Sequence, residues 1–387
     1  MITYFDNFTF LNPLTKGMPS ASYWALLLYL IPVAITCIIN NSFSWNLAII
    51  IIISIIGYFA LLIFIPKCIP SHIHAQLSGI DINKQGSIRI PESMGLETSF
   101  ILILLLVGIA SFSESKDALY PGIIAIIITT LLGFADDVLN IPWRVKIVIP
   151  FISCLPIILG YSGSTTICLH GFLSPLKSLF KFDCIDIGPL YLVYIICLFV
   201  FCTHSINIYA GINGLEAGQS FVVGCFLLFH CISYWSYDEN SRAAACLLIP
   251  FLATTFALLY FNWYPSRVFV GDTFTLTAGS VIAAAGIIGH FAEMTLLFML
   301  PQLINFVFSL PQLIGIIKCG RHRLPKLNEK SLKLEGRKEN LNVVNYWLIL
   351  FGPKTEKRLC LELVIFQGVC CILAYVVKYL YNRTMAP

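Results

Sequence analysis

Two adjacent acidic residues stand at the end of a long apolar run. No charged residue occurs between Pro121 and Phe134, and Asp136 and Asp137 then follow in the string GFADDVLN. One polar residue would suffice to end a hydrophobic segment, and an acidic pair at a helix end is about as often solvated as functional. The pair becomes informative if other polar residues are brought to the same place.

Four further strings are rich in residues that bind metals and phosphates. They are DINKQGSIRIPESMG (81–95), NIYAGINGLEAGQ (207–219), NWYPSRVFVGDTF (262–274) and CGRHRLPKLNEK (319–330). With the string at 133–146, they supply the carboxylates Asp136, Asp137 and Asp272, the polar partners Asn207, Asn213 and Glu216, and the cations Lys146, Arg267, Arg321 and Arg323.

These residue types favour a phosphate substrate bound with Mg²⁺. This ion takes oxygen ligands and needs only one or two protein carboxylates when substrate phosphates supply the rest. Cations beside it offset the charge that develops in phosphoryl transfer. Gly211, Gly214 and Gly218 are expected to let backbone N–H groups approach a nucleotide closely.

Each string also has an ordinary structural interpretation when it is taken alone. NGLE is a plausible turn and helix start, and VFVGD is a plausible strand or helix end. RHR fits the usual excess of basic residues in cytosolic loops, and Phe269 would ordinarily be a packing residue. These interpretations become less plausible together if all five strings lie on one side of a membrane.

The composition indicates an integral membrane protein. Of the 387 residues, 58% are hydrophobic and 11% are charged, against roughly 25% charged in soluble domains. Apolar runs close to the ~20 residues of a spanning helix recur along the chain. We predict an all-α polytopic bundle of about 10–11 transmembrane helices with cytosolic catalytic loops. The spans are placed at 23–41, 46–65, 98–112, 121–135, 147–161, 189–206, 219–235, 243–261, 274–290, 294–315 and 359–380.

Basic residues set the orientation, because cytoplasmic loops retain Lys and Arg. Seventeen of the 24 Lys and Arg residues fall in the loops of one side, and four fall in the loops of the other. The first side is therefore predicted to be cytosolic, and it holds all five polar strings. It consists of loops 66–97, 136–146, 207–218, 262–273 and 316–358.

Ionisable residues are scarce inside the predicted spans. Charges at the bilayer centre mark ion or proton pathways, so their scarcity favours chemistry at the membrane surface over proton-coupled transport. A transporter or a non-catalytic scaffold remains the alternative of a different class. Cys168 and Cys184 share one non-cytosolic loop, and the sequence leaves open whether they pair.

The strings GFADDVLNIPWRVK, NIYAGINGLEAGQS, NWYPSRVFVGDTF and RHRLPKLN resemble a known family. It is the eukaryotic UDP-N-acetylglucosamine–dolichyl-phosphate N-acetylglucosaminephosphotransferase family, within the polyprenyl-phosphate N-acetylhexosamine-1-phosphate transferase superfamily. The resemblance implies a helical bundle, often dimeric, in the endoplasmic reticulum membrane with its active site facing the cytosol. It implies the substrates UDP-GlcNAc and dolichyl phosphate, the cofactor Mg²⁺ and inhibition by tunicamycin, and no nucleic-acid partner.

The implied reaction moves GlcNAc-1-phosphate from UDP-GlcNAc to dolichyl phosphate, the first step of the lipid-linked oligosaccharide for N-glycosylation. A sibling transferase using another UDP-sugar is the second alternative, although the RHR string disfavours it. The resemblance also implies a role for each matching residue. Asn207 and Asp272 match metal ligands, Phe269 and Asn213 uracil contacts, Arg321 a pyrophosphate contact, His322 and Arg323 sugar contacts, Lys146 an acceptor-phosphate cation, Glu92 an acid lining the site, and Asp136 and Asp137 paired acids of unsettled role.

The resemblance begins near residue 46, which divides the chain in two. Residues 1–45 form an N-terminal extension with an expected extra span at 23–41, and residues 46–387 form the transferase domain. Its sugar-recognition loop is predicted at about 316–358, which is shorter than in animal members of the family.

The charge distribution predicts the position of two N-x-S/T strings. If 23–41 spans the membrane, Asn7 lies in the cytosol and stays unmodified, while Asn382 faces the lumen. The measurement is the gel shift produced by endoglycosidase after expression in microsomes. A glycan on Asn7 would contradict the eleven-span arrangement and favour ten spans. Asn382 lies too near the last helix for its glycan to be diagnostic.

Overall fold

The computed structural model describes residues 44–84, 89–168, 184–318 and 323–383, and most of these residues are helical. The helices are α2 (Trp45–His74), α3 (Gly95–Phe112), α4 (Lys116–Leu139), α5 (Trp143–Ser153), α6 (Leu155–Leu159), α8 (Pro189–Ile208), α9 (Leu215–Tyr234), α10 (Glu239–Asn262), α11 (Gly271–Ile288), α12 (Ala292–Phe298), α13 (Leu300–Leu313), α14 (Val343–Phe351) and α15 (Glu356–Arg383). Three short antiparallel hairpins join β1 (Ser78–Ile80) to β2 (Arg89–Pro91), β3 (Thr166–Cys168) to β4 (Cys184–Asp186), and β5 (Lys326–Asn328) to β6 (Lys333–Glu335).

Eight helices in the described part of the chain are long and apolar enough to cross a membrane. They are α2, α3, α4, α8, α9, α10, α11 and α15, and the bent pair α12 and α13 would make a ninth. The predicted all-α polytopic fold is therefore confirmed. The predicted span at 23–41 lies outside the described residues.

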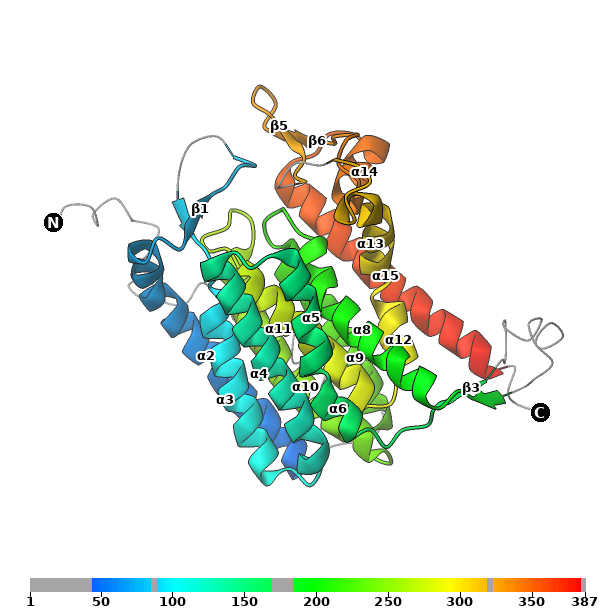
Figure 1. Ribbon diagram of the computed structural model, residues 1–387. Helices are drawn as coiled ribbons and strands as arrows, with labels where there is room; N and C mark the ends of the chain where they lie inside the picture. Colours follow the sequence, from blue (N-terminus) through cyan, green and yellow to red (C-terminus); the bar gives the residue numbers. More distant parts are fainter. Residues whose placement is uncertain (1–43, 85–88, 169–183, 319–322, 384–387) are drawn as a thin grey trace.

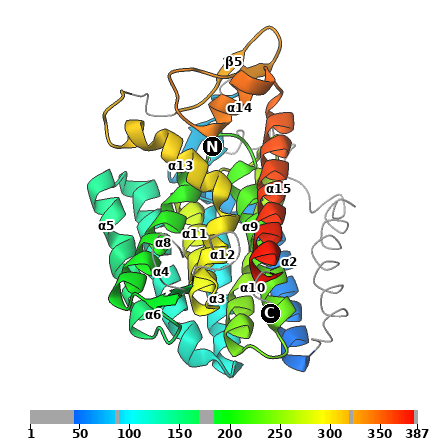
Figure 2. The same ribbon diagram turned by 90° about the vertical axis from the view of Figure 1, so that its right-hand side faces the viewer.

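Prolines break two of the predicted spans. The segment predicted as one span at 147–161 is instead α5 and α6, of 11 and 5 residues, and that prediction was wrong. Pro156 is the second residue of α6, and a proline lacks the N–H that would continue the helix and clashes with the preceding turn. Pro301 is similarly the second residue of α13, which is bent by 70° from α12. Figure 2 shows α13 leaving the direction of α12.

The central helices pack through small residues. In its most apolar stretch α11 is 89% buried and α10 is 83% buried, against 33% for α15 at the periphery. Small side chains let membrane helices approach closely. A Cβ at Gly279 of α11 would lie 2.1 Å from the carbonyl oxygen of Cys202 in α8, and one at Gly133 of α4 would lie 2.6 Å from the Cα of Thr273.

The two ends of the bundle differ. The hairpins β1–β2 and β5–β6 and helix α14 lie at one end, where α4 and α8 finish and α11 begins, whereas β3–β4 lies at the other (Figure 1). A second apolar core packs the segment before α15 and the start of α15 against the end of the bundle that carries β5–β6 and α14. It consists of Tyr209, Ile212, Leu215, Leu334, Val343, Val344, Leu348, Leu359, Cys360 and Leu363.

The close approach of α4 to α11 predicts contrasting effects for two helical glycines. Gly133→Ala forces α11 away and should destabilise the protein by about 1–3 kcal/mol, as overpacking does. Gly108→Ala, on α3, meets no atom within 4 Å and should be neutral or stabilising by up to about 1 kcal/mol through helix propensity. Melting temperatures in detergent test the difference. Equal melting temperatures would show that the close approach is dispensable.

Candidate active site

A buried lysine lies where three helices meet. Lys146 of α5 places its ammonium 2.5 Å from Asp136 Oδ2, at the end of α4, and in contact with Asp272 Oδ2, in the first turn of α11. The Lys146 side chain is only 11% exposed. An ammonium in such a place requires paired carboxylates, because an unpaired buried charge is costly. Residues 136, 146 and 272 are therefore brought together as the sequence predicted.

Asp272 also contacts the predicted amide ligand. Asn207, near the end of α8, donates from Nδ2 to Asp272 Oδ1 at 2.7 Å. Gly271, just before Asp272, has φ +72°, and a Cβ there would lie 2.6 Å from Asp137 Oδ2 and 2.7 Å from the Cα of Ser93. Only glycine fits both the backbone angle and the space. The VFVGD string thus turns tightly into α11 and presents Asp272.

The two adjacent aspartates do different things. Asp137 accepts hydrogen bonds from the backbone N–H of Asp272 at 2.7 Å and of Thr273 at 3.1 Å, and from the Thr273 hydroxyl at 2.6 Å. It therefore caps the N-terminus of α11 from α4, where a negative charge is also favoured by the helix dipole. Asp136 instead faces Lys146. The sequence left this division of roles open.

Backbone hydrogen bonds at the end of α4 hold the Asp136 side chain in place. Asn140 is in the left-handed region, with φ +52°, and its N–H donates to the carbonyl of Asp136 at 2.8 Å. Asparagine tolerates this helix-ending conformation better than most residues. The chain then reverses, and the Ile141 N–H donates to Asp136 Oδ1 at 2.8 Å. One oxygen of Asp136 is held by backbone and the other faces Lys146.

Two cavities meet at these residues. The larger, of about 670 Å³, is lined by the predicted residues Glu92, Asn207, Asn213, Phe269 and Asp272. The smaller, of about 280 Å³, is lined by Lys146, Asn207 and Arg323. Asn207, Ala210, Gly211 and Leu324 line both. Arg321 and His322 lie outside the described residues.

Glu92 and Phe269 are fixed on the wall of the larger cavity. The Phe269 N–H donates to the carbonyl of Pro91 at 2.8 Å, and its carbonyl accepts from the Met94 N–H at 3.1 Å. Burial raises the pKa of the Glu92 carboxyl, and the negative charge of Asp137 adds to the effect. Glu92 therefore takes up a proton more readily than an exposed glutamate.

Comparisons with known proteins agree with this geometry. Residues 119–290 match glycosyl transferase family 4. The chain is 39% identical to the UDP-N-acetylglucosamine–dolichyl-phosphate N-acetylglucosaminephosphotransferase of Dictyostelium discoideum, over 79% of this chain and 82% of the relative. Those of Schizosaccharomyces pombe and Saccharomyces cerevisiae are 35% and 32% identical, over 73% and 83% of this chain and 71% and 88% of their own. The chain belongs to the UDP-N-acetylglucosamine–dolichyl-phosphate N-acetylglucosaminephosphotransferase family.

Three groups that the sequence suggested for the substrate are bonded within the protein instead. Arg267 lies over the rings of Tyr260 and Phe261, 4.7 Å from each, and lines neither cavity. The N–H of Gly211, expected to approach a nucleotide, donates to Glu216 Oε1 at 3.1 Å. The N–H of Gly218 belongs to the first turn of α9, where it donates to the carbonyl of Gly214.

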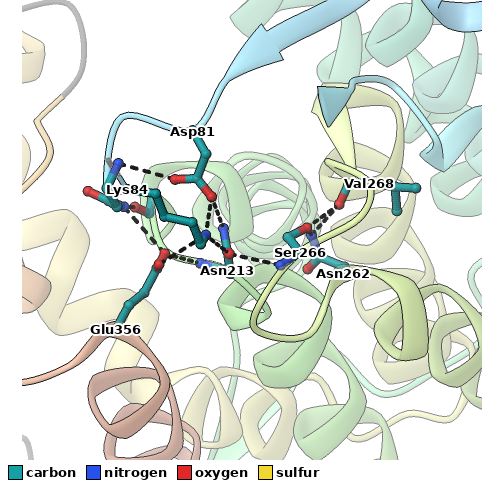
Figure 3. Close-up of polar contacts among 9 residues, drawn as sticks. Asp81, Lys84, Asn213, Asn262, Ser266, Val268 and Glu356 are labelled. Carbon is teal, nitrogen blue, oxygen red and sulfur yellow. Dashed lines mark hydrogen bonds and ion pairs between the residues drawn. The ribbon is translucent and has the colours of Figure 1, made fainter. Parts of the chain in front are cut away.

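Asn213 lies in a network that the sequence did not reveal. Its Nδ2 donates to Asp81 Oδ2 at 3.1 Å, and its Oδ1 accepts from the Ser266 N–H at 3.0 Å and from Lys84 (Figure 3). Glu356 Oε1, at the start of α15, accepts from the Asn213 N–H at 2.8 Å. Asp81 and Lys84 stand in a string already singled out, whereas Glu356 looks like an ordinary acid beginning a helix.

The two aspartates should respond differently to the same substitution. Asp137→Asn places an amide against the donors of Thr273 and should cost about 1–3 kcal/mol, the penalty for buried groups left unsatisfied. Asp136→Asn still accepts from Ile141 and leaves Lys146 paired with Asp272, so it should lower turnover with little effect on stability. Melting temperature and turnover, measured on both variants, test this. Equal melting temperatures for the two would refute the capping role of Asp137.

Proposed function

We propose that the protein transfers GlcNAc-1-phosphate from UDP-GlcNAc to dolichyl phosphate, giving GlcNAc-PP-dolichol and UMP. This would be the first step of lipid-linked oligosaccharide synthesis for protein N-glycosylation. The family supports the substrates, since the relatives bear the name of this activity. The observation that carries the proposal is the Lys146 ammonium between Asp136 and Asp272, where two cavities meet at one end of a membrane bundle.

The larger cavity suits the nucleotide sugar. Its volume of about 670 Å³ is in the usual range for small-molecule sites, about 300–1,000 Å³. Phe269 offers an aromatic face for uracil, while Asp272 and Asn207 stand where the pyrophosphate would lie between the nucleoside and Lys146. Arg323, which lines the neighbouring cavity, is the residue that we propose to contact the sugar.

The smaller cavity suits the phosphate of the lipid acceptor. Lys146 and Trp143 of α5 line it, and Trp143, Val145 and Val148 on the same helix are about half exposed. An apolar helix face beside a buried ammonium would let a lipid chain stay in the bilayer while its phosphate reaches Lys146. Lys146 thereby holds the acceptor next to the donor pyrophosphate, and this proximity is a large part of the catalysis we propose.

The charge around Lys146 supports the proposed Mg²⁺ dependence. Asp136, Asp137 and Asp272 carry three carboxylates against one ammonium, an excess of negative charge that would repel a pyrophosphate. No group of three or more His, Cys, Asp or Glu residues in the described part of the chain could hold a metal, but Mg²⁺ needs only one or two carboxylates beside substrate phosphates. Asp272 and the Oδ1 of Asn207 fit this requirement. A bound Mg²⁺ would neutralise charge on the pyrophosphate and on the departing UMP.

The chain's own residues then need only to position the reactants. An oxygen of dolichyl phosphate attacks the phosphorus that carries GlcNAc, and the bond from that phosphorus to UMP breaks. A phosphate monoester has a second pKa near 6, so the acceptor is largely deprotonated before it binds. Asp136 therefore serves chiefly to hold and orient Lys146, and charge stabilisation is the main catalytic term.

We further propose that the protein lies in the endoplasmic reticulum membrane with this site facing the cytosol. The site lies at the end of the bundle whose loops carry most of the basic residues. At the opposite end, Cys184 is disulfide-bonded and lies directly across the β3–β4 ladder from Cys168. Disulfides persist in oxidising compartments such as the lumen of the endoplasmic reticulum. The homodimer implied by the resemblance stays a prediction.

The test is transfer of label from radiolabelled UDP-GlcNAc to dolichyl phosphate by the purified protein. We expect product only with Mg²⁺ present, and none with tunicamycin. Substituting UDP-GalNAc for UDP-GlcNAc examines the sibling-transferase alternative. Absence of a labelled lipid under all these conditions would refute the proposed activity.

Two substitutions should separate the metal from the nucleoside. Asp272→Asn removes the charge that would hold Mg²⁺ and should lower turnover on the order of 10²–10³, by analogy with the loss of one oxyanion donor. Higher Mg²⁺ should restore part of it. Phe269→Ala should raise the KM for UDP-GlcNAc, and extra Mg²⁺ should not help. Normal activity of Asp272→Asn at low Mg²⁺ would show that Asp272 is not a ligand.

A further inference from the structure

A buried ionic cluster joins three separate parts of the chain beside the larger cavity. Lys84 Nζ contacts Asp81 Oδ2 and lies 3.3 Å from Glu356 Oε2, and it also contacts the amide oxygen of Asn213 (Figure 3). The side chains of Asp81 and Glu356 are 7% and 3% exposed. Two buried carboxylates this close require a cation, and Lys84 supplies it.

One arm of the cluster shapes the loop after β1. Asp81 Oδ1 accepts from the Asn83 N–H at 3.1 Å, which closes a local turn. Asn83 Nδ2 in turn donates to the carbonyl of Gly211 at 2.9 Å. Asp81, Ile82 and Asn83 all line the larger cavity. The turn held by Asp81 is therefore part of the wall that a nucleotide would meet.

The other arm runs toward Phe269. The oxygen of the Asn213 amide accepts from the Ser266 N–H at 3.0 Å, and the Ser266 hydroxyl donates to the carbonyl of Val268 at 2.6 Å. Asn262 Nδ2 donates to the same carbonyl at 2.9 Å. Val268 precedes Phe269 directly, so the network reaches the residue assigned to uracil. Displacing Asn213 would therefore disturb both the turn at Asp81 and the segment that carries Phe269.

We propose that Lys84 and Glu356 are positioning residues that form a charge-balanced clamp on the nucleoside half of the cavity. This inference rests on the proposed function for the identity of the ligand, a uridine nucleotide. In the clamp, Glu356 accepts the Asn213 N–H and pairs with the Lys84 ammonium. Lys84 in turn pairs with Asp81, whose carboxylate closes the turn at Asn83. Asn213 connects the loop after β1 to the segment before Phe269, because its side-chain NH2 and its side-chain oxygen are both hydrogen-bonded to protein.

The charges make the clamp testable, because removing the cation alone is worse than removing the cation with one anion. Lys84→Met keeps a stem of similar length and leaves Asp81 and Glu356 facing each other. We expect about a tenfold rise in KM for UDP-GlcNAc and in the inhibition constant of UMP, the size associated with losing a charged hydrogen bond. Turnover and the KM for dolichyl phosphate should stay within about twofold.

The double variant decides whether charge balance is the cause. Glu356→Gln retains an oxygen for the Asn213 N–H and should raise the KM for UDP-GlcNAc only about threefold, as an uncharged hydrogen bond is weaker. The combination of Lys84→Met with Glu356→Gln should be less impaired than Lys84→Met alone, because one of the facing carboxylates is gone. Multiplying effects in the double variant would overturn the clamp.

Glu362→Gln provides the matched control. Glu362 lies on α15 six residues beyond Glu356 and also forms ion pairs, 3.2 Å from Lys354 and 2.9 Å from Arg358, but it lines neither cavity. Its loss should leave every kinetic constant unchanged, and melting temperatures of all variants show whether folding contributes. A rise in KM equal to that of Glu356→Gln would mean that ion pairs on α15 act only through stability.

Measuring UMP binding tests the clamp independently of the transfer reaction. Calorimetry with UMP on the full protein should show about tenfold weaker binding for Lys84→Met, whether or not transfer to dolichyl phosphate is detected. Failure of the transfer assay alone would count against the proposed function. Unchanged UMP affinity in Lys84→Met, or no UMP binding by the wild-type protein, would overturn the clamp.

Discussion

The hydrogen bonds from the N-terminus of α11 to Asp137 are the interaction on which the site depends. They join the end of α4 to the start of the most buried helix, and they place Asp136 and Asp272 on either side of Lys146. Without this cap, the first N–H groups of α11 would be unsatisfied among buried residues. Gly133 and Gly271 permit the junction, since a side chain at either position would meet the opposing helix or Asp137.

A second polar device works within the apolar part of the bundle. Pro301 ends the regular hydrogen bonding between α12 and α13, and three buried glutamines surround the bend. Gln302 donates to Gln219 on α9 and to Gln367 on α15, both at 2.7 Å, and Gln367 donates to the carbonyl of Phe298 at the end of α12. Polar groups remote from water must find partners inside the protein. The broken helix is therefore tied to its neighbours by side chains.

The sequence predicted what depends on composition and on local order along the chain. Hydropathy located the helices, and the motifs named Asp136, Lys146, Asn207 and Asp272, which do converge. Proline effects at residue 156 were visible in the sequence and were missed, because an apolar run of sufficient length outweighed them. The individual side-chain contacts between distant segments outside these four residues could not be predicted. Asp81, Lys84 and Glu356 are ordinary residues until the fold places a hairpin against the first turn of α15.

Gly211 lies at the boundary of the two cavities. Its φ of +112° favours glycine, and a Cβ there would lie 2.5 Å from the side chain of Leu324. Gly211 and Leu324, together with Asn207 and Ala210, line both cavities, so this turn and one leucine form much of the boundary between them. Lys146, which lines the smaller cavity, contacts Asp272, which lines the larger, so this ion pair lies at the junction of the two cavities. The same turn carries Asn213, so the packing at this boundary is continuous with the network that joins Asn213 to Asp81, Lys84 and Glu356.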